Sequence, residues 1–139
     1  MWVACHKRLP TQDRMSLWKD NPPDYKCGLC LSCMDSHSHL FFECNYSKEV
    51  RDGVVRELDW DGFPSSWDDI VDAISTVGSM PRQLVHKLTL VASVYFVWNE
   101  RNSRIFSDKK RPPIVLIKEI LALIRLRADW ECRMKKIDL

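Results

Sequence analysis

The feature that most constrains this chain is a cluster of cysteines and histidines in its N-terminal third. Four of the six cysteines and two of the four histidines fall between residues 27 and 44. Zn²⁺ takes four soft or borderline ligands at tetrahedral corners. A C-x2-C motif can place two sulfurs on one metal, and Gly28 would ease the turn between them. The favoured pattern is C-x2-C-x8-H-x4-C, formed by Cys27, Cys30, His39 and Cys44. Four protein ligands leave no open coordination position, so the pattern predicts a structural Zn²⁺ site and not a catalytic one.

Other assignments of the cluster remain open at this point. Cys33 or His37 could replace one of the four ligands. A thioredoxin-like redox role would place the C-x2-C motif in a βαβ unit, and no such unit is visible. Nucleophilic catalysis by a Cys–His pair would need an orienting acid, and none is evident. Unmetallated residues are disfavoured because several thiols would then gather around a polar loop without a role.

The N-terminus and the apolar runs indicate where such a protein resides. Residues 1–8 lack a basic stretch followed by a continuous apolar one, so they do not form a secretory signal. The longest apolar-rich run, 84–98, contains polar and charged residues and is shorter than the roughly 20 residues that span a bilayer. We therefore expect an intracellular protein, nuclear or cytoplasmic, without a membrane partner. Thiols stay reduced there, which favours metal binding over disulfides.

Helical periodicity dominates the rest of the chain. The 139 residues are 45% hydrophobic, which fits one compact domain or a domain with a small satellite. Two long helices are predicted at about 82–102 and 114–135, and shorter ones near 1–9, 11–18, 47–58 and 66–74. The expected apolar seam of the first long helix is Leu84, Leu88, Val91, Tyr95 and Trp98, and that of the second is Ile117, Leu121, Ile124 and Ala128.

No strand pattern is long enough to build a sheet, and Leu40–Phe42 could form a very short strand at most. The predicted fold is therefore mainly α, a helical domain with a small structural zinc knuckle and little or no sheet. Two helix starts are expected from their capping residues, at Ser47 and at Ser66 with Asp69 three positions later.

The net charge of +2 conceals an uneven distribution. Residues 1–53 are neutral overall, 54–81 are acidic, and 82–139 are basic. We expect three parts: a zinc-binding region with flanking helices at 1–58, an acidic connector with a short helix at 59–81, and two long helices with a basic linker at 82–139.

Several motifs in order resemble a known family. They are RLPTQDRM at 8–15, the C-x2-C motif, HLFFEC at 39–44, SKEV at 47–50 and VWNERNSRIF at 97–106. Together they are similar to the zinc-binding region that lies downstream of the polymerase in plant non-LTR (LINE-type) retrotransposon reverse transcriptases. The resemblance covers roughly residues 2–106 and implies Zn²⁺ ligation by Cys27, Cys30, His39 and Cys44. Arg51 departs from the tryptophan usual in the family, which suggests a relaxed or domesticated copy.

The resemblance also implies contact with element RNA or target DNA. Basic residues would neutralise phosphates, giving salt-dependent and largely sequence-independent affinity. The candidates form two groups, Lys7, Arg8 and Arg14 near the cluster, and Arg101, Arg104, Lys109, Lys110 and Arg111 further on.

Polymerase and nuclease motifs are not visible in the chain, so we expect no enzymatic activity and regard the chain as a piece of a longer element. The parent polymerase domain or another protein is a further possible partner. The alternative is an architectural or protein-interaction helical domain, left from a degenerate retroelement and without nucleic-acid binding.

Overall fold

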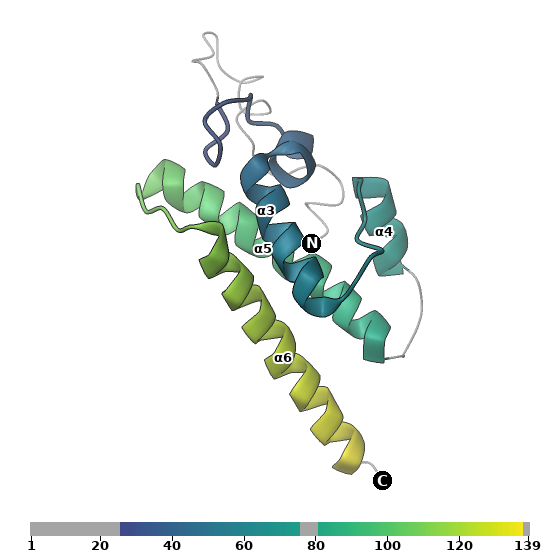
Figure 1. Ribbon diagram of the computed structural model, residues 1–139. Helices are drawn as coiled ribbons and strands as arrows, with labels where there is room; N and C mark the ends of the chain where they lie inside the picture. Colours follow the sequence, from purple (N-terminus) through teal and green to yellow (C-terminus); the bar gives the residue numbers. More distant parts are fainter. Residues whose placement is uncertain (1–25, 76–80, 138–139) are drawn as a thin grey trace.

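A computed structural model describes residues 26–75 and 81–137. They form a π-helix, η1 (His39–Glu43), and four α-helices (Figure 1): α3 (Asn45–Leu58), α4 (Trp67–Ser75), α5 (Pro81–Phe106) and α6 (Pro113–Ile137). These residues contain no β-strand, only an isolated antiparallel bridge between Lys26 and Met34. The predicted mainly α class is confirmed. The short strand considered for Leu40–Phe42 is wrong, because these residues lie in η1. The two helices expected at 1–9 and 11–18 lie outside the described residues.

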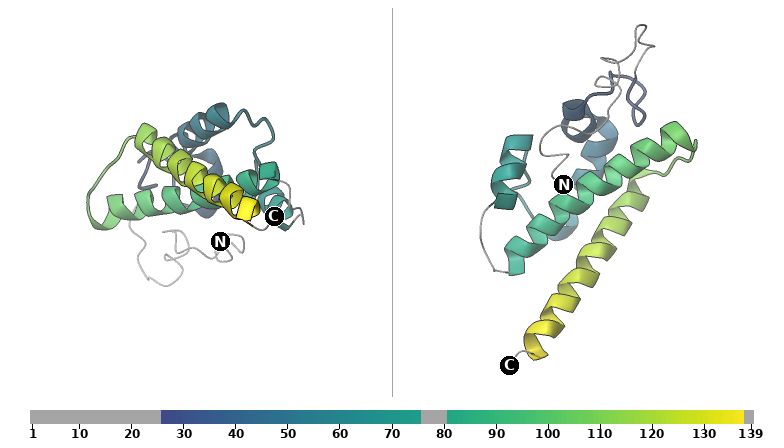
Figure 2. Two further views of the ribbon diagram at one scale, coloured as in Figure 1. Left: turned by 90° about the horizontal axis from the view of Figure 1, so that it is seen from below. Right: turned by 180° about the vertical axis from the view of Figure 1, so that it is seen from behind.

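Helix α5 is the centre of the fold. It contacts η1, α3, α4 and α6. Helix α6 returns in the opposite direction after a short connection and diverges from α5 toward its own C-terminal end (Figures 1 and 2). Helix α3 packs against α6 as well as α5, while α4 contacts α5. No helix among the described residues has both the length and the apolar content to cross a membrane.

The α3–α6 contact depends on a glycine in the middle of α3. Glycine in a helix interior costs about 1 kcal/mol relative to alanine. A Cβ at Gly53 would collide with Cδ1 of Ile117 on α6. The missing side chain therefore lets the two helices approach closely, and Val50 and Val54 beside it are buried in the core.

The buried face of α5 differs from the predicted seam. Val91 and Tyr95 are 41% and 58% exposed, so the seam is wrong at these two positions. Ala92 is buried, and so are Leu90, Val97 and the polar or charged residues Thr89, Ser93, Glu100 and Arg101. Hydrophobic periodicity cannot select a face that contains this many polar groups. On α6 the predicted Leu121 and Ile124 are buried, as are Leu116 and Ile120.

One of the two predicted helix N-caps is confirmed and the other is wrong. The Asp69 N–H donates to Ser66 Oγ at 3.2 Å, as the capping pattern predicted. The predicted cap at Ser47 is wrong, because α3 begins two residues earlier with Cys44 at the N-cap. The Ser47 hydroxyl instead donates to the carbonyl of Leu40 and joins α3 to η1.

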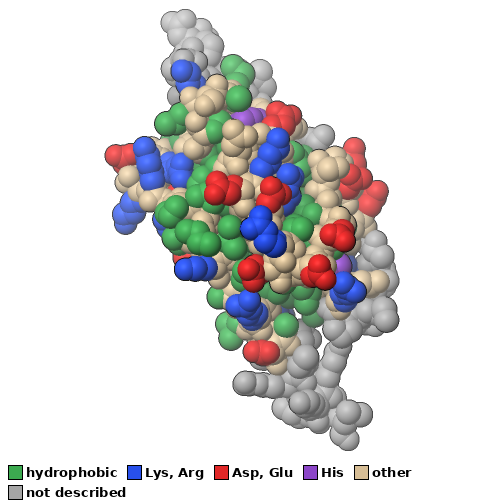
Figure 3. Space-filling model, in the orientation of Figure 1, with side chains coloured by type: hydrophobic (Ala, Val, Ile, Leu, Met, Phe, Trp, Pro, Cys, Tyr) green, Lys and Arg blue, Asp and Glu red, His purple; other side chains and the backbone are tan. Residues whose placement is uncertain are grey.

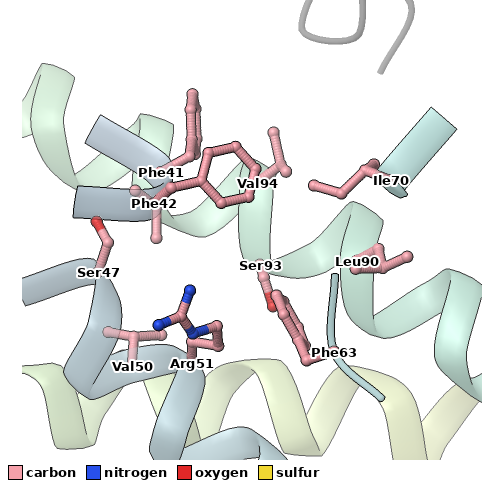
Figure 4. A pocket seen from close by; sticks show the side chains of 11 residues that line it. Phe41, Phe42, Ser47, Val50, Arg51, Phe63, Ile70, Leu90, Ser93 and Val94 are labelled. Carbon is pink, nitrogen blue, oxygen red and sulfur yellow. The ribbon is translucent and has the colours of Figure 1, made fainter. Parts of the chain in front are cut away.

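A small hollow remains between η1, α3, α4 and α5 (Figure 4). Its volume is about 30 Å³, enough for about two water molecules. Phe42 and Val94 lie along one side and Arg51 along the opposite one, next to Phe63. The buried Ser93 hydroxyl has no hydrogen-bond partner among the described residues. The hollow is too small for an organic ligand.

Candidate metal centre

The first two cysteines lie on a tight loop. The Cys27 N–H donates to the Cys33 carbonyl at 2.7 Å, and the Leu31 N–H donates to the Cys27 carbonyl at 2.9 Å. The left-handed residue of this loop is Leu31, with φ of 58°, and not Gly28. Gly28 serves another purpose, since a Cβ there would lie 3.1 Å from Cγ1 of Ile105 on α5. Its role is therefore close approach to α5 rather than the turn that the sequence suggested.

The other two ligands lie at the ends of η1. The Cys44 N–H donates to the His39 carbonyl at 2.7 Å, which is the i→i+5 bond of a π-helix. In an α-helix, residues five apart point about 140° away from each other. The wider π turn brings residue 44 back over residue 39. The H-x4-C spacing is therefore compatible with a single metal because the segment is not α-helical.

The four predicted ligands converge. One ligand atom from each of Cys27, Cys30, His39 and Cys44 lies within 4.8 Å of all the others. The Cys27 and Cys44 sulfurs are 3.9 Å apart, and the Cys30 sulfur is 3.3 Å from His39 Nε2. Tetrahedral Zn²⁺ with bonds of about 2.3 Å separates two sulfurs by about 3.8 Å. The observed spacing fits this geometry.

The shifted pKa values of the two buried thiols, Cys27 and Cys44, are also consistent with binding of a cation between them. A hydrogen bond from the Cys27 thiol lowers the pKa of Cys44 to about 5, against the opposing effect of burial. The same hydrogen bond, together with burial, raises the pKa of Cys27 above its ordinary value. Metal ligation requires deprotonated thiols, so a divalent cation between these two sulfurs would displace the proton of this hydrogen bond.

The two competing ligands lie elsewhere. Cys33 is exposed and is not a member of the converging group. His37 is buried among aromatic rings, with its centroid 4.5 Å from that of Trp67 and 5.4 Å from that of Phe41. The structure therefore brings together the favoured set of four and leaves both alternatives outside it.

Arginines of α5 attach the loop to the helical domain. Arg104 Nη1 donates to the Leu29 carbonyl at 3.0 Å, between the first two ligands. Arg101 Nη2 forms a buried ion pair with Asp35 Oδ2 at 2.6 Å. The sequence had placed both arginines among the candidate phosphate contacts. Here they face carboxylates and carbonyls of the protein itself.

A second arginine network surrounds Glu100, which is fully buried. Its two carboxylate oxygens accept from Arg104 Nε and Arg111 Nε, each at 2.9 Å. Burial raises the pKa of Glu100, but these hydrogen bonds outweigh it and hold the pKa below its ordinary value. Arg111 also pairs with Glu119 on α6 at 2.9 Å. We call Glu100, Arg104, Arg111 and Glu119 the Glu100 network.

The remaining basic candidates fall into two groups. Lys109 and Lys110 are exposed on the connection between α5 and α6. Lys7, Arg8 and Arg14 lie outside the described residues. The anchoring roles of Asp35 and Glu100 were not predicted from the sequence. The Glu100–Arg104 spacing of four residues was the available signal, because such pairs face each other on a helix.

A Cys₃His cluster beside a helical domain defines the class as a zinc-binding protein. Residues 1–50 match the sequence family described as zinc-binding in reverse transcriptase, and all four ligands lie inside the matched segment. This segment is therefore similar to the zinc-binding regions of reverse transcriptases, and its four converging residues fit Zn²⁺ as the cofactor. The family is defined by metal binding and not by polymerase catalysis. No curated protein and no solved structure matches the chain.

Proposed function

We propose that this chain is a non-catalytic, zinc-stabilised domain of a retrotransposon-derived reverse transcriptase of the plant non-LTR type. In this proposal it assists the polymerase in binding RNA or DNA and acts in the nucleus or cytoplasm. The observation that carries the proposal is the convergence of four protein ligands in a segment that matches this family.

A structural role for the metal follows from the ligand set. Three thiolates and one imidazole complete a tetrahedral shell, so no position remains for water or substrate. Cys27 and Cys44 are fully buried, and His39 is nearly so. When bound, Zn²⁺ adds folding free energy to that gained by burying Leu29, Leu40 and Phe41 of this segment. This favours a role in holding residues 26–44 against α5.

A nucleic-acid role is supported by the charge near this anchored loop. Lys and Arg side chains gather at the left edge of the face in Figure 3, where α5 joins α6. Lys109 and Lys110 are exposed in this region, and Arg104 links the same end of α5 to the metal loop. Exposed cations of this kind bind phosphates in a salt-dependent manner.

Two measurements test the proposal. Elemental analysis of the reduced, purified chain should give one zinc per molecule, and Cys44→Ser should abolish it. Filter binding with zinc-loaded chain at low and at moderate salt should show affinity for RNA or DNA that falls as salt rises. Zinc near zero would overturn the metal centre. Absence of nucleic-acid binding even at low salt would instead support the architectural or protein-interaction alternative.

A further inference from the structure

A shallow groove lies at the corner where α5 joins α6. Its volume is about 600 Å³, within the range of about 300–1,000 Å³ typical of small-molecule sites. One side comes from the last two turns of α5 and the other from the following connection. The lining includes Asn99, Asn102, Ser103, Phe106, Lys109 and Arg111.

The groove combines an exposed aromatic ring with polar groups. Phe106 is 74% exposed, the largest value among the described large hydrophobic residues. A ring held at the edge of a polar groove favours a flat partner that can stack on it, and every nucleobase has such a face.

The polar side of the groove suits the edge of a base. Asn99 and Asn102 present amide groups one turn apart. Arg101 Nη1 donates to Asn102 Oδ1 at 2.8 Å, which orients this amide, and its NH₂ group supplies hydrogen-bond donors. Amide and hydroxyl groups can hydrogen-bond the Watson–Crick edge of an unpaired base.

The charge of the groove suits a phosphate chain. None of the described residues that line it is acidic. The charge of Arg111 is balanced by Glu100 and Glu119. Lys109 and the adjacent Lys110 are exposed, so they are placed to contact phosphates.

We infer that this groove binds single-stranded nucleic acid, with Phe106 stacked on an unpaired base and Lys109 and Lys110 against the phosphates. The inference rests on the proposed function, and it specifies the form of nucleic acid and its place on the protein. A duplex suits the groove less well, because its bases stack on each other and offer no free face to Phe106.

Fluorescence anisotropy with the zinc-loaded full chain tests this inference. The probes are labelled single-stranded RNA and DNA of about 12 nucleotides, within the usual site sizes of about 4–16, and a duplex of the same length. We expect the single strands to bind more tightly than the duplex. Phe106→Ala should weaken single-strand binding by at least roughly fivefold, the lower end of the effect of losing one base stack. Phe106→Trp should retain it.

Tyr95→Ala is the matched control, because Tyr95 is another exposed aromatic on α5 but does not line the groove. Its affinity should equal that of the unaltered chain. Equal affinity of Phe106→Ala and the unaltered chain, or a duplex bound as tightly as a single strand, overturns the inference and leaves the proposed function intact. If the unaltered chain binds no probe at low salt, the proposed nucleic-acid role itself is overturned, and this inference falls with it.

Discussion

The metal loop at residues 26–44 and the Glu100 network both connect separate segments of the chain, but they are held by different chemistry. The loop gathers four ligand atoms around a site that a cation completes. The network gathers Arg104 and Arg111 around a buried carboxylate that belongs to the chain itself. The loop therefore depends on metal supply, while the network depends on the protonation state of one glutamate.

The two regions are also joined. Arg104 donates both to Glu100 and to the Leu29 carbonyl in the metal loop. It further donates to the Arg111 carbonyl, which also accepts from the Tyr46 hydroxyl of α3. One arginine thus connects the metal loop, α5 and the start of α6. The comparison predicts that losing the metal unfolds the loop, whereas losing the network destabilises the helical domain with its zinc retained.

The largest effect is expected from Cys44→Ser. This change removes one of four ligands at a site whose metal contributes on the order of 10 kcal/mol in small zinc-dependent folds. Zinc content should fall to near zero, and amide hydrogen exchange should show loss of protection in residues 26–44. Cys33→Ser is the matched control and should keep its zinc, because Cys33 is exposed and outside the ligand group. Equal zinc loss in both variants would contradict the ligand assignment.

Glu100→Gln should have the next largest effect. It removes the carboxylate charge from a fully buried network and leaves two arginines without their shared partner. Breaking a buried ion pair from one side costs about 3–5 kcal/mol, measurable by denaturant unfolding. Glu119→Gln is the control, because its side chain is partly exposed and such pairs contribute about 1 kcal/mol or less. Zinc content should stay at one per chain in both. A destabilisation no larger than that of the control would show that the network is dispensable.

Gly53→Ala should destabilise the α3–α6 contact by about 1–3 kcal/mol, despite the better helix propensity of alanine. The added Cβ would collide with the Ile117 side chain, so this side chain or one of the helices must shift. The unfolding midpoint measures the loss. Combining the change with Ile117→Val, which shortens the opposing side chain, should recover part of the stability. If Gly53→Ala alone raised the unfolding midpoint, α3 and α6 would be able to accommodate the added Cβ without loss of stability.

The smallest expected effect is the pH dependence of the Glu100 contribution. The folded pKa of Glu100 lies below its ordinary value, so its stabilising effect is complete above about pH 4.5 and is lost as pH falls through the folded pKa. The difference in unfolding free energy between the unaltered chain and Glu100→Gln should therefore be largest above about pH 4.5 and shrink as the pH falls below that value. Comparing the two chains at each pH cancels the acid sensitivity of the metal site that both share. A constant difference would indicate that Glu100 is not the titrating group.

Some parts of the sequence predicted their structural role and others did not. The spacing of Cys27, Cys30, His39 and Cys44 was informative because metal geometry restricts ligand spacing strongly. The polar residues of α5 were not informative in this way, because a sequence does not distinguish a buried arginine from a solvated one. Arg101 and Arg104 were therefore expected to face phosphate, although their partners Asp35 and Leu29 lie more than 60 positions away along the chain.

By itself, the sequence predicted the helical class, the two long helices and the four candidate ligands that the structure brings together. Each of these depends on local periodicity or on ligand chemistry within a short segment. Only the tertiary structure decided that η1 is a π-helix, that Gly53 meets Ile117, and that a buried glutamate organises the end of α5. These features depend on contacts between residues distant in the sequence, where burial and charge pairing outweigh local preference.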